Sequence, residues 1–217
     1  ELNFFTFFVF VILIFEFLTL DFKNFNHLVD IFHEGMWLSA SQNLKLSSQY
    51  WQSSFIAYGF FADFYPYFLW EIFNKESVGI TRFFQLIIIL LNKTLILLII
   101  KKISLSTNFP KKILITFFLA LCAIILPLQA YVSPIFAERS FLYLLFIFVF
   151  LNFLQNYNNS FYYIFLLGIF SSASSFWYLD ISVYINSILI ILLAYFFIKL
   201  EIKNIVILFF STLFGWF

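Results

Sequence analysis

Long runs of apolar residues dominate the chain, and polar residues interrupt them at only a few places. A helix that crosses the hydrocarbon core of a membrane needs about 20 mostly apolar residues, and several runs approach that length. The complete windows are 4–20, 83–100, 113–131, 140–155, 161–179 and 181–198. A seventh window begins at residue 204 and is too short for a span when it reaches residue 217. The pattern predicts an all-α, polytopic transmembrane protein with six complete helices and a truncated seventh.

The two ends of the sequence favour a fragment of a longer protein. The chain begins at Glu1, without an initiator Met or a basic stretch before the first window, and it ends on an apolar Gly-Trp-Phe. A cleaved signal peptide would need a basic start and a small-residue cleavage site, which the first window lacks. We therefore expect residues 1–217 to form a single transmembrane domain with a retained first helix.

The composition excludes several other classes of protein. Hydrophobic residues make up 64% of the chain and charged residues only 11%, whereas soluble domains have about 25% charged residues. A soluble enzyme could not bury this much apolar surface. The single cysteine, Cys122, permits no intrachain disulfide, and a net charge of +1 gives no basic surplus for nucleic acid. The expected partner is the lipid bilayer.

Lysines in two short connections predict the orientation. Loops on the cytoplasmic side carry an excess of Lys and Arg, and both connections fall on the same side when the N-terminus is cytoplasmic. Residues 21–79, the 132–139 connection and the turn at Asp180 then lie outside. We expect an integral protein of a bacterial inner membrane. The lysines are Lys101, Lys102, Lys111, Lys112, Lys199 and Lys203.

Residues 21–79 form the one long connection, followed by the predicted helix bundle at 80–217. This outer loop is too aromatic for a solvated linker, since it holds Trp37, Trp51 and Trp70. Residues 28–46 show imperfect helical periodicity, and 65–73 read as a second short helix because proline is favoured in a first helical turn. Both are predicted to be amphipathic helices lying in the outer interface.

The densest polar cluster lies at the start of this loop, in His27, Asp30, His33 and Glu34. On a helix, positions 27, 30 and 34 share a face. One interpretation is the polar face of an interfacial helix. A second is a carboxylate, Asp30 or Glu34, that acts as a general base. A third is a divalent-cation site with His27, Asp30 and His33 as ligands.

Four residues further along the chain lie near the predicted outer boundary. Arg82 either reaches the interface from its helix or meets a phosphate group. Arg139 pairs with Glu138 or Asp180, or holds a phosphate through two hydrogen bonds. Asp180, between two predicted helices, is a substrate-facing acid or a turn residue.

Three other polar residues have roles that the sequence leaves open. Lys93 lies near the middle of its window, where a charge is costly and marks a functional hypothesis, although its side chain can also extend toward the cytoplasmic end. Glu16, inside the first window, is a candidate counter-ion. Asp63, shortly before Pro66, is expected to cap a helix.

The arrangement resembles the membrane-integral glycosyltransferases of the C superfamily, which include protein O-mannosyltransferases and aminoarabinose transferases. The resemblance rests on one helix, a long outer loop and closely spaced helices thereafter. It also rests on Asp30-Ile-Phe-His-Glu34-Gly, where these families carry their catalytic acid, and on the outer Glu138-Arg139. Gly59-Phe-Phe-Ala-Asp-Phe-Tyr-Pro-Tyr-Phe-Leu-Trp70 and Ser77-Val-Gly-Ile-Thr-Arg82 look like the run into their second helix. His33-Glu34 replaces the adjacent Asp-Glu pair that is frequent there.

The resemblance implies transfer of a sugar from a polyprenyl-phosphate donor to an acceptor at the outer face. Asp30 or Glu34 would be the general base, and the substrate-binding residues would be Arg82, Glu138, Arg139 and Asp180. No Gly-rich phosphate loop is present, so the expected cofactors are limited to a divalent cation. The rival interpretations are a transporter or flippase fragment and a non-catalytic membrane assembly subunit.

Overall fold

The computed structural model describes residues 28–29, 33–49, 56, 58–106, 135–157 and 161–216, with Phe7, Val11, Ile14 and Leu18 nearer the N-terminus. At residues 33, 104–106 and 135–138 it describes the backbone alone. These ranges contain seven helices and no strand, so the all-α prediction is confirmed for them. The helices are α2 (His33–Ser47), α4 (Phe60–Phe73), α5 (Val78–Ser106), α7 (Ile135–Gln155), α8 (Phe161–Trp177), α9 (Leu179–Ile198) and α10 (Ile202–Trp216).

The predicted windows correspond to these helices with shifted ends. Window 113–131 lies outside the described residues, and window 4–20 is described only at Phe7, Val11, Ile14 and Leu18. Helix α5 extends beyond 83–100 in both directions. The break between α8 and α9 lies at Tyr178, which is extended with φ −145° and ψ 128°, and not at Asp180 as predicted. The break is fixed by a tertiary contact, because the Leu179 amide donates a hydrogen bond to the Tyr58 carbonyl (2.8 Å).

Two of the described helices are long and apolar enough to cross a membrane. They are Val78–Ile103 in α5, with 26 residues, and Leu179–Ile198 in α9, with 20 residues. Arg139–Gln155, Phe161–Trp177 and Ile202–Trp216 are apolar but shorter, with 10–17 residues each.

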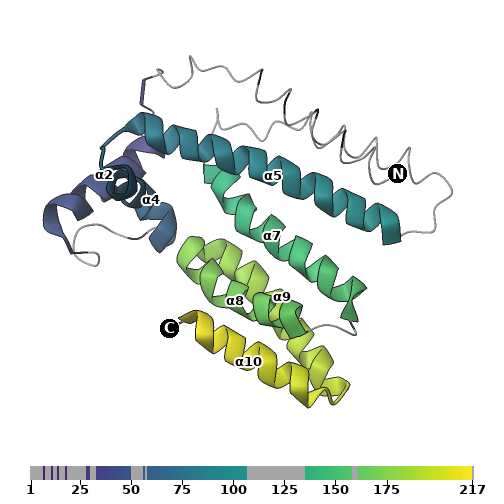
Figure 1. The fold of residues 1–217 in the computed structure, drawn as a ribbon. Helices are drawn as coiled ribbons and strands as arrows, with labels where there is room; N and C mark the ends of the chain where they lie inside the picture. Colours follow the sequence, from purple (N-terminus) through teal and green to yellow (C-terminus); the bar gives the residue numbers. More distant parts are fainter. Residues whose placement is uncertain are drawn as a thin grey trace.

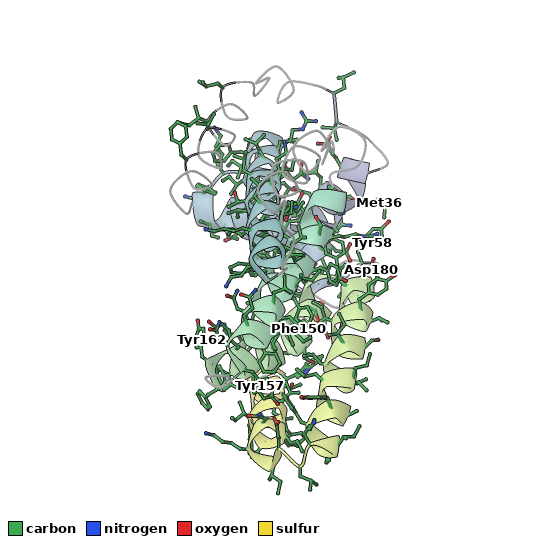
Figure 2. The ribbon with its side chains drawn as sticks, turned by 90° about the vertical axis from the view of Figure 1, so that its right-hand side faces the viewer. Met36, Tyr58, Phe150, Tyr157, Tyr162 and Asp180 are labelled. Atoms are coloured by element: carbon green, nitrogen blue, oxygen red, sulfur yellow. The ribbon has the colours of Figure 1, made fainter. Side chains whose placement is uncertain are left out.

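The long helices stack in sequence across the molecule (Figure 1), in the order α5, α7, then α8 with α9, then α10. Helices α2 and α4 pack together across one end of this stack, which we call the α2 end. Figure 2 shows the stack from the far end, with Met36, Tyr58 and Asp180 higher in the view than Phe150, Tyr162 and Tyr157.

Helices α5 and α7 run in the same direction. In the middle of α5, the Asn92 amide donates a hydrogen bond to Ser140 Oγ near the start of α7 (2.9 Å), and at the far end Lys102 Nζ donates to Gln155 Oε1 at the end of α7 (3.0 Å). Ser106 and Ile135 therefore lie toward opposite ends of the stack. Helices α8, α9 and α10 then alternate in direction, joined by short turns.

The core lies where α7, α8 and α9 meet and consists of large apolar side chains. Those with no exposed surface include Phe146, Ile164, Ile185 and Phe196. Partly buried residues of α4, α5 and α10 extend this cluster on either side. Burial of such side chains stabilises the fold by about 1.5–3 kcal/mol each when the exposed alternative is water.

Small residues bring α8 and α10 into close contact. A Cβ atom added to Gly168 would lie 1.7 Å from Ser211 Oγ, and one added to Gly215 would lie 1.9 Å from Ser172 Oγ. Gly168 and Ser172 are four residues apart, as are Ser211 and Gly215, so each glycine faces a serine of the other helix. This is the small-residue spacing that lets helix backbones approach closely.

Helix α4 begins earlier than the sequence predicts, at Phe60 and not at residue 65. Gly59 precedes the helix with φ 153°, a backbone conformation that side-chain-bearing residues rarely adopt. Asp63 accepts hydrogen bonds from the amides of Tyr58 (3.0 Å) and Gly59 (3.4 Å). The prediction that Asp63 caps the helix was wrong, because the N-cap is Gly59 and Asp63 lies in the first turn of α4. From there its carboxylate reaches back to the amides at the helix start, a full turn before Pro66.

Candidate functional site

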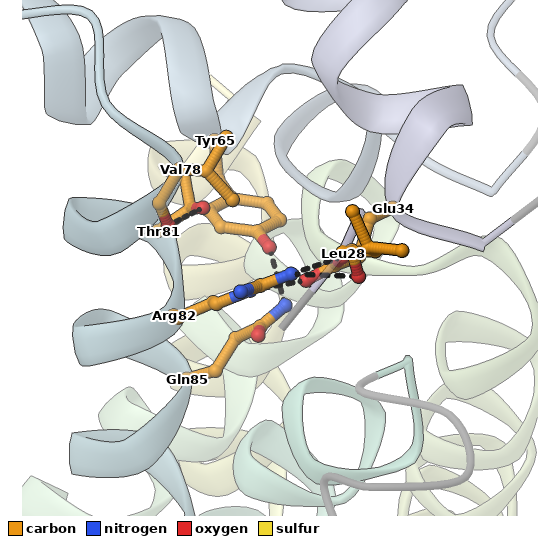
Figure 3. A network of polar contacts seen from close by, with 7 residues as sticks. All are labelled: Leu28, Glu34, Tyr65, Val78, Thr81, Arg82 and Gln85. Atoms are coloured by element: carbon orange, nitrogen blue, oxygen red, sulfur yellow. Dashed lines mark hydrogen bonds and ion pairs between the residues drawn. The ribbon is translucent and has the colours of Figure 1, made fainter. Parts of the chain in front are cut away.

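Glu34 and Arg82 form a two-pronged ion pair at the α2 end (Figure 3). Arg82 Nε lies 2.8 Å from Glu34 Oε1, and Arg82 Nη2 lies 2.7 Å from Glu34 Oε2. The two side chains are only 12% and 13% exposed. Such a fork-to-fork arrangement has good hydrogen-bond geometry at both oxygens. It fixes the start of α2 against the start of α5.

Polar contacts surround this pair. Arg82 Nη2 also approaches the Leu28 carbonyl oxygen (3.4 Å), and Gln85 Nε2 donates to the hydroxyl of Tyr65 (2.7 Å). The Tyr65 ring in turn packs against the Trp37 ring, with centroids 5.8 Å apart. The ion pair therefore belongs to a hydrogen-bonded junction of α2, α4 and α5, and both oxygens of Glu34 are engaged in it.

Arg139 and Asp180 form a second pair at the same end, with looser geometry. Arg139 Nη1 lies 3.5 Å from Asp180 Oδ2, and the side chains are 26% and 47% exposed. The guanidinium lies between two tyrosine rings, with 5.2 Å to the Tyr58 centroid and 5.3 Å to the Tyr178 centroid. Its buried Nε has no hydrogen-bond partner among the described residues. Arg139 therefore keeps unused donor capacity.

The loop before α4 carries Tyr58 to Arg139. A Cβ atom added to Gly59 would lie 2.6 Å from the carbonyl oxygen of Trp177, so only glycine allows this approach. The next turn is held by a stacked pair, Phe61 and Trp177, with ring centroids 4.4 Å apart and planes inclined by 12°. The end of α8 thus positions both the loop and the start of α9.

The structure brings together four of the predicted site residues and leaves the others undescribed. Glu34, Arg82, Arg139 and Asp180 all lie toward the α2 end, in two separate pairs. Of the two pairings predicted for Arg139, the structure contains the one with Asp180. The remaining calls lie outside the described residues: His27 and Asp30 entirely, and the side chains of His33 and Glu138.

The predicted metal ligands His27, Asp30 and His33 are among these residues, so the cation site stays a prediction. In the described ranges, no group of three or more His, Cys, Asp and Glu side chains is placed to hold a metal ion.

Sequence reasoning missed the aromatic and amide partners of the site. Tyr58 and Tyr178 cover the guanidinium of Arg139, and Gln85 joins the junction through Tyr65. Tyrosines are frequent throughout this chain, so composition did not distinguish these two. The helical spacing of Arg82 and Gln85 was the available signal for Gln85, since residues three apart lie on neighbouring positions of one face.

Polar residues also occupy the middle of α5. Asn92 is fully buried and Lys93 is 8% exposed. Its proposed counter-ion, Glu16, lies outside the described residues. The Asn92 bond to Ser140 ties this level of α5 to α7.

A separate cluster lies at the far end. The hydroxyl of Tyr157 donates to Glu201, which also accepts a hydrogen bond from the Asn204 amide. Burial and the hydrogen bond to Glu201 raise the pKa of the Tyr157 phenol. This cluster joins the end of α7 to the start of α10 and lies away from the two arginine pairs.

Comparison with known proteins provides no family for the chain: no family model matches it, and neither a curated protein nor a solved structure matches it at a significant level.

Proposed function

We propose that this chain is a polytopic membrane protein that transfers a sugar from a polyprenyl-phosphate donor to an acceptor at the outer face of the membrane. The α2 end would face outward and the far end, with Lys101 and Lys102, the cytoplasm. The membrane would be a bacterial inner membrane. The acceptor would be a hydroxyl-bearing molecule.

Two features support a place in the membrane. The first is the pair of long apolar helices, in α5 and α9. The second is the outer surface of α9 and α10, where Ile191, Phe210 and Phe214 are each more than half exposed. Large contiguous apolar surfaces are rare on soluble monomers. Helix α8, with 17 residues, would be about 25 Å long, the lower limit for a span.

The observation that carries the proposed activity is the gathering of carboxylates and guanidiniums at one end of an apolar helix stack. A polyprenyl-phosphate sugar has its tail in lipid and its reactive anomeric carbon at the interface. Transfer requires a carboxylate to take a proton from the acceptor hydroxyl and cations to stabilise the departing phosphate. With the α2 end at the outer face, Arg82, Arg139 and Asp180 would lie near such a headgroup.

The proposed roles follow from these positions. Asp30 or Glu34 is the general base, with Arg82 and Arg139 as phosphate partners and Glu138 and Asp180 as acceptor-binding residues. Because Glu34 holds Arg82 with both oxygens, it must release one oxygen before it can take a proton. A divalent cation bound by His27, Asp30 and His33 would add positive charge near the phosphate.

Substitution of the two candidate bases tests the activity. We expect Asp30→Asn or Glu34→Gln to abolish transfer from polyprenyl-phosphate sugars in membrane vesicles, with unchanged membrane insertion. Glu71→Gln, which alters an exposed carboxylate of α4, serves as the matched control and should keep wild-type transfer. Wild-type levels of product in both candidate variants would refute the proposed chemistry.

Lys93 favours transport as a second candidate function. Transporters place ionisable groups near the midplane of the membrane, and Lys93 is nearly buried within the apolar span of α5. Under this alternative, Lys93→Met would abolish substrate movement across the membrane, while Glu34→Gln would leave it intact. Under the transferase proposal, Glu34→Gln would abolish sugar transfer, while Lys93→Met would leave it intact.

A further inference from the structure

The two arginine pairs at the α2 end differ in how completely the arginine is occupied. Arg82 is held at 2.7 and 2.8 Å by both oxygens of a carboxylate that is almost fully enclosed. Arg139 has one carboxylate contact at 3.5 Å, with a partner that is nearly half exposed. Arg82 is therefore fully paired with a carboxylate, whereas Arg139 is only weakly paired, although the sequence gives no sign of this difference.

We infer that Asp180 is a displaceable counter-ion, which occupies the anion position of Arg139 until a phosphate group replaces it. Binding of the phosphate then frees the Asp180 carboxylate beside the bound group. This inference rests on the proposed function, in which Arg139 meets the donor phosphate, and it adds an order of events: the phosphate binds first, and a free carboxylate appears as a consequence.

The surroundings of Arg139 leave part of its donor capacity unused, because its buried Nε lacks a partner among the described residues and its side chain is 26% exposed. Tyr58 and Tyr178 contact the guanidinium through their rings, and ring contacts hold the planar group without using its N–H donors. A phosphate offers several acceptor oxygens and forms a two-pronged contact with a guanidinium, which a single distant carboxylate oxygen does not.

Asp180 is placed to give way without leaving the site. Exposed ion pairs contribute little, because solvent screens them, so one phosphate outcompetes the contact at 3.5 Å. The other carboxylate oxygen, Oδ1, accepts a hydrogen bond from the Ile181 amide (2.9 Å) in the first turn of α9. After displacement this bond keeps Asp180 at the helix start, with Oδ2 free to accept a hydrogen bond from an acceptor hydroxyl.

Binding of a short prenyl phosphate tests the exchange. The full chain in lipid nanodiscs would be titrated with radiolabelled farnesyl phosphate, with empty nanodiscs subtracted, and with inorganic phosphate and farnesol in parallel. We expect Arg139→Gln to weaken farnesyl phosphate binding by about tenfold or more, as loss of a two-pronged charged contact implies. We expect Asp180→Asn to tighten binding by about two- to fivefold, because a weak competing contact is removed.

Controls separate this inference from general effects. Arg139→Lys keeps the positive charge but loses the planar guanidinium, so its affinity for farnesyl phosphate should lie between those of the wild type and Arg139→Gln. Lys45→Gln, which removes an exposed cation of α2 that pairs with Glu76, should leave the affinity unchanged. Thermal unfolding of each variant identifies any that fail to fold, and Arg139→Lys then carries the test.

The outcomes are distinct. Unchanged or weaker binding in Asp180→Asn would overturn the exchange, as would an equal loss in Lys45→Gln and Arg139→Gln. Competition by inorganic phosphate as strong as that of farnesyl phosphate would assign the site to free phosphate, and competition by farnesol alone would overturn the anion site. Absence of sugar transfer would refute the proposed function and leave these binding results intact.

Discussion

At the scale of single residues, the environment of each charge separates groups that the sequence presents alike. Glu34 and Asp180 are both acids near the predicted outer boundary. Glu34 is largely buried and binds Arg82 through both carboxylate oxygens, whereas Asp180 is nearly half exposed and lies 3.5 Å from Arg139. The energetic consequences differ accordingly. Breaking an enclosed pair leaves a desolvated charge, whereas breaking an exposed pair leaves a solvated one.

We predict that Glu34→Gln destabilises the protein by about 2 kcal/mol, because it leaves Arg82 largely enclosed without its counter-charge. Thermal unfolding in detergent measures the loss. The double variant Glu34→Gln with Arg82→Gln should recover part of the stability, since neither charge then remains. The exposed pair Lys45 and Glu76 is the control, and its removal should have no measurable effect. Equal losses for the two pairs would contradict the prediction.

Tyr157 gives a prediction about alkaline pH. Burial and the Glu201 hydrogen bond raise its pKa above the ordinary value, about 10 for a tyrosine. The folded protein holds the phenol proton more tightly than the unfolded chain. This stabilisation is therefore fully present below about pH 10 and is lost as the pH rises through the higher folded-state pKa.

The variant Tyr157→Phe lacks this titration. We expect the wild-type protein to be the more stable of the two at neutral pH, and the difference in melting temperature to shrink above about pH 10. A series of melting temperatures from neutral to alkaline pH measures this. A difference that stays constant across the series would show that the Tyr157 proton does not contribute.

At the scale of helices, the apolar windows predicted the existence of α5, α7, α8, α9 and α10, but tertiary contacts decided their ends. The break at Tyr178 follows from the hydrogen bond between Leu179 and Tyr58. The early start of α4 follows from Asp63, which accepts hydrogen bonds from the amides preceding the helix. In both cases the deciding partner is a group whose proximity only folding creates.

We predict that Gly168→Ala destabilises the α8–α10 contact by about 2 kcal/mol. The added methyl group would overlap Ser211 Oγ and lie 3.0 Å from the Leu208 carbonyl oxygen, and overpacking of this kind typically costs about 1–3 kcal/mol. Chemical or thermal unfolding of the purified variant provides the measurement.

Two further variants make this test specific. Gly79→Ala is the matched control, because its nearest neighbour, Ser77 Oγ, lies at an ordinary 3.4 Å, and alanine is the better helix former. Adding Ser211→Gly to Gly168→Ala should restore part of the stability. If Gly79→Ala and Gly168→Ala were equally harmful, the close helix approach would not be the cause.

At the scale of the whole molecule, the direction of the helices places the charged groups at opposite ends. The arginine pairs lie toward the α2 end, while Lys102, Gln155 and the Tyr157 cluster lie at the far end. In the orientation predicted from the lysines, the α2 end would face outward and the far end the cytoplasm.

Cysteine labelling tests the proposed orientation. In a Cys122→Ala background, we expect Asn43→Cys to react with a membrane-impermeant maleimide in intact spheroplasts, because Asn43 is exposed on α2. Asn156→Cys, exposed after α7, should react only in inverted vesicles. Labelling of both cysteines from the same side would contradict the orientation, and the reverse pattern would place the α2 end in the cytoplasm.

The sequence by itself determined the all-helical class and the approximate positions of the described helices, because apolar runs of this length form helices whatever surrounds them. It also identified Glu34, Arg82, Arg139 and Asp180 as candidate residues, since charges are rare in this chain. Only the tertiary structure decided that Glu34 binds Arg82 through both carboxylate oxygens, while Arg139 contacts two tyrosine rings and has a donor, Nε, without a partner among the described residues. Pairing depends on distances between helices far apart in the sequence, and no local pattern of residues encodes those distances.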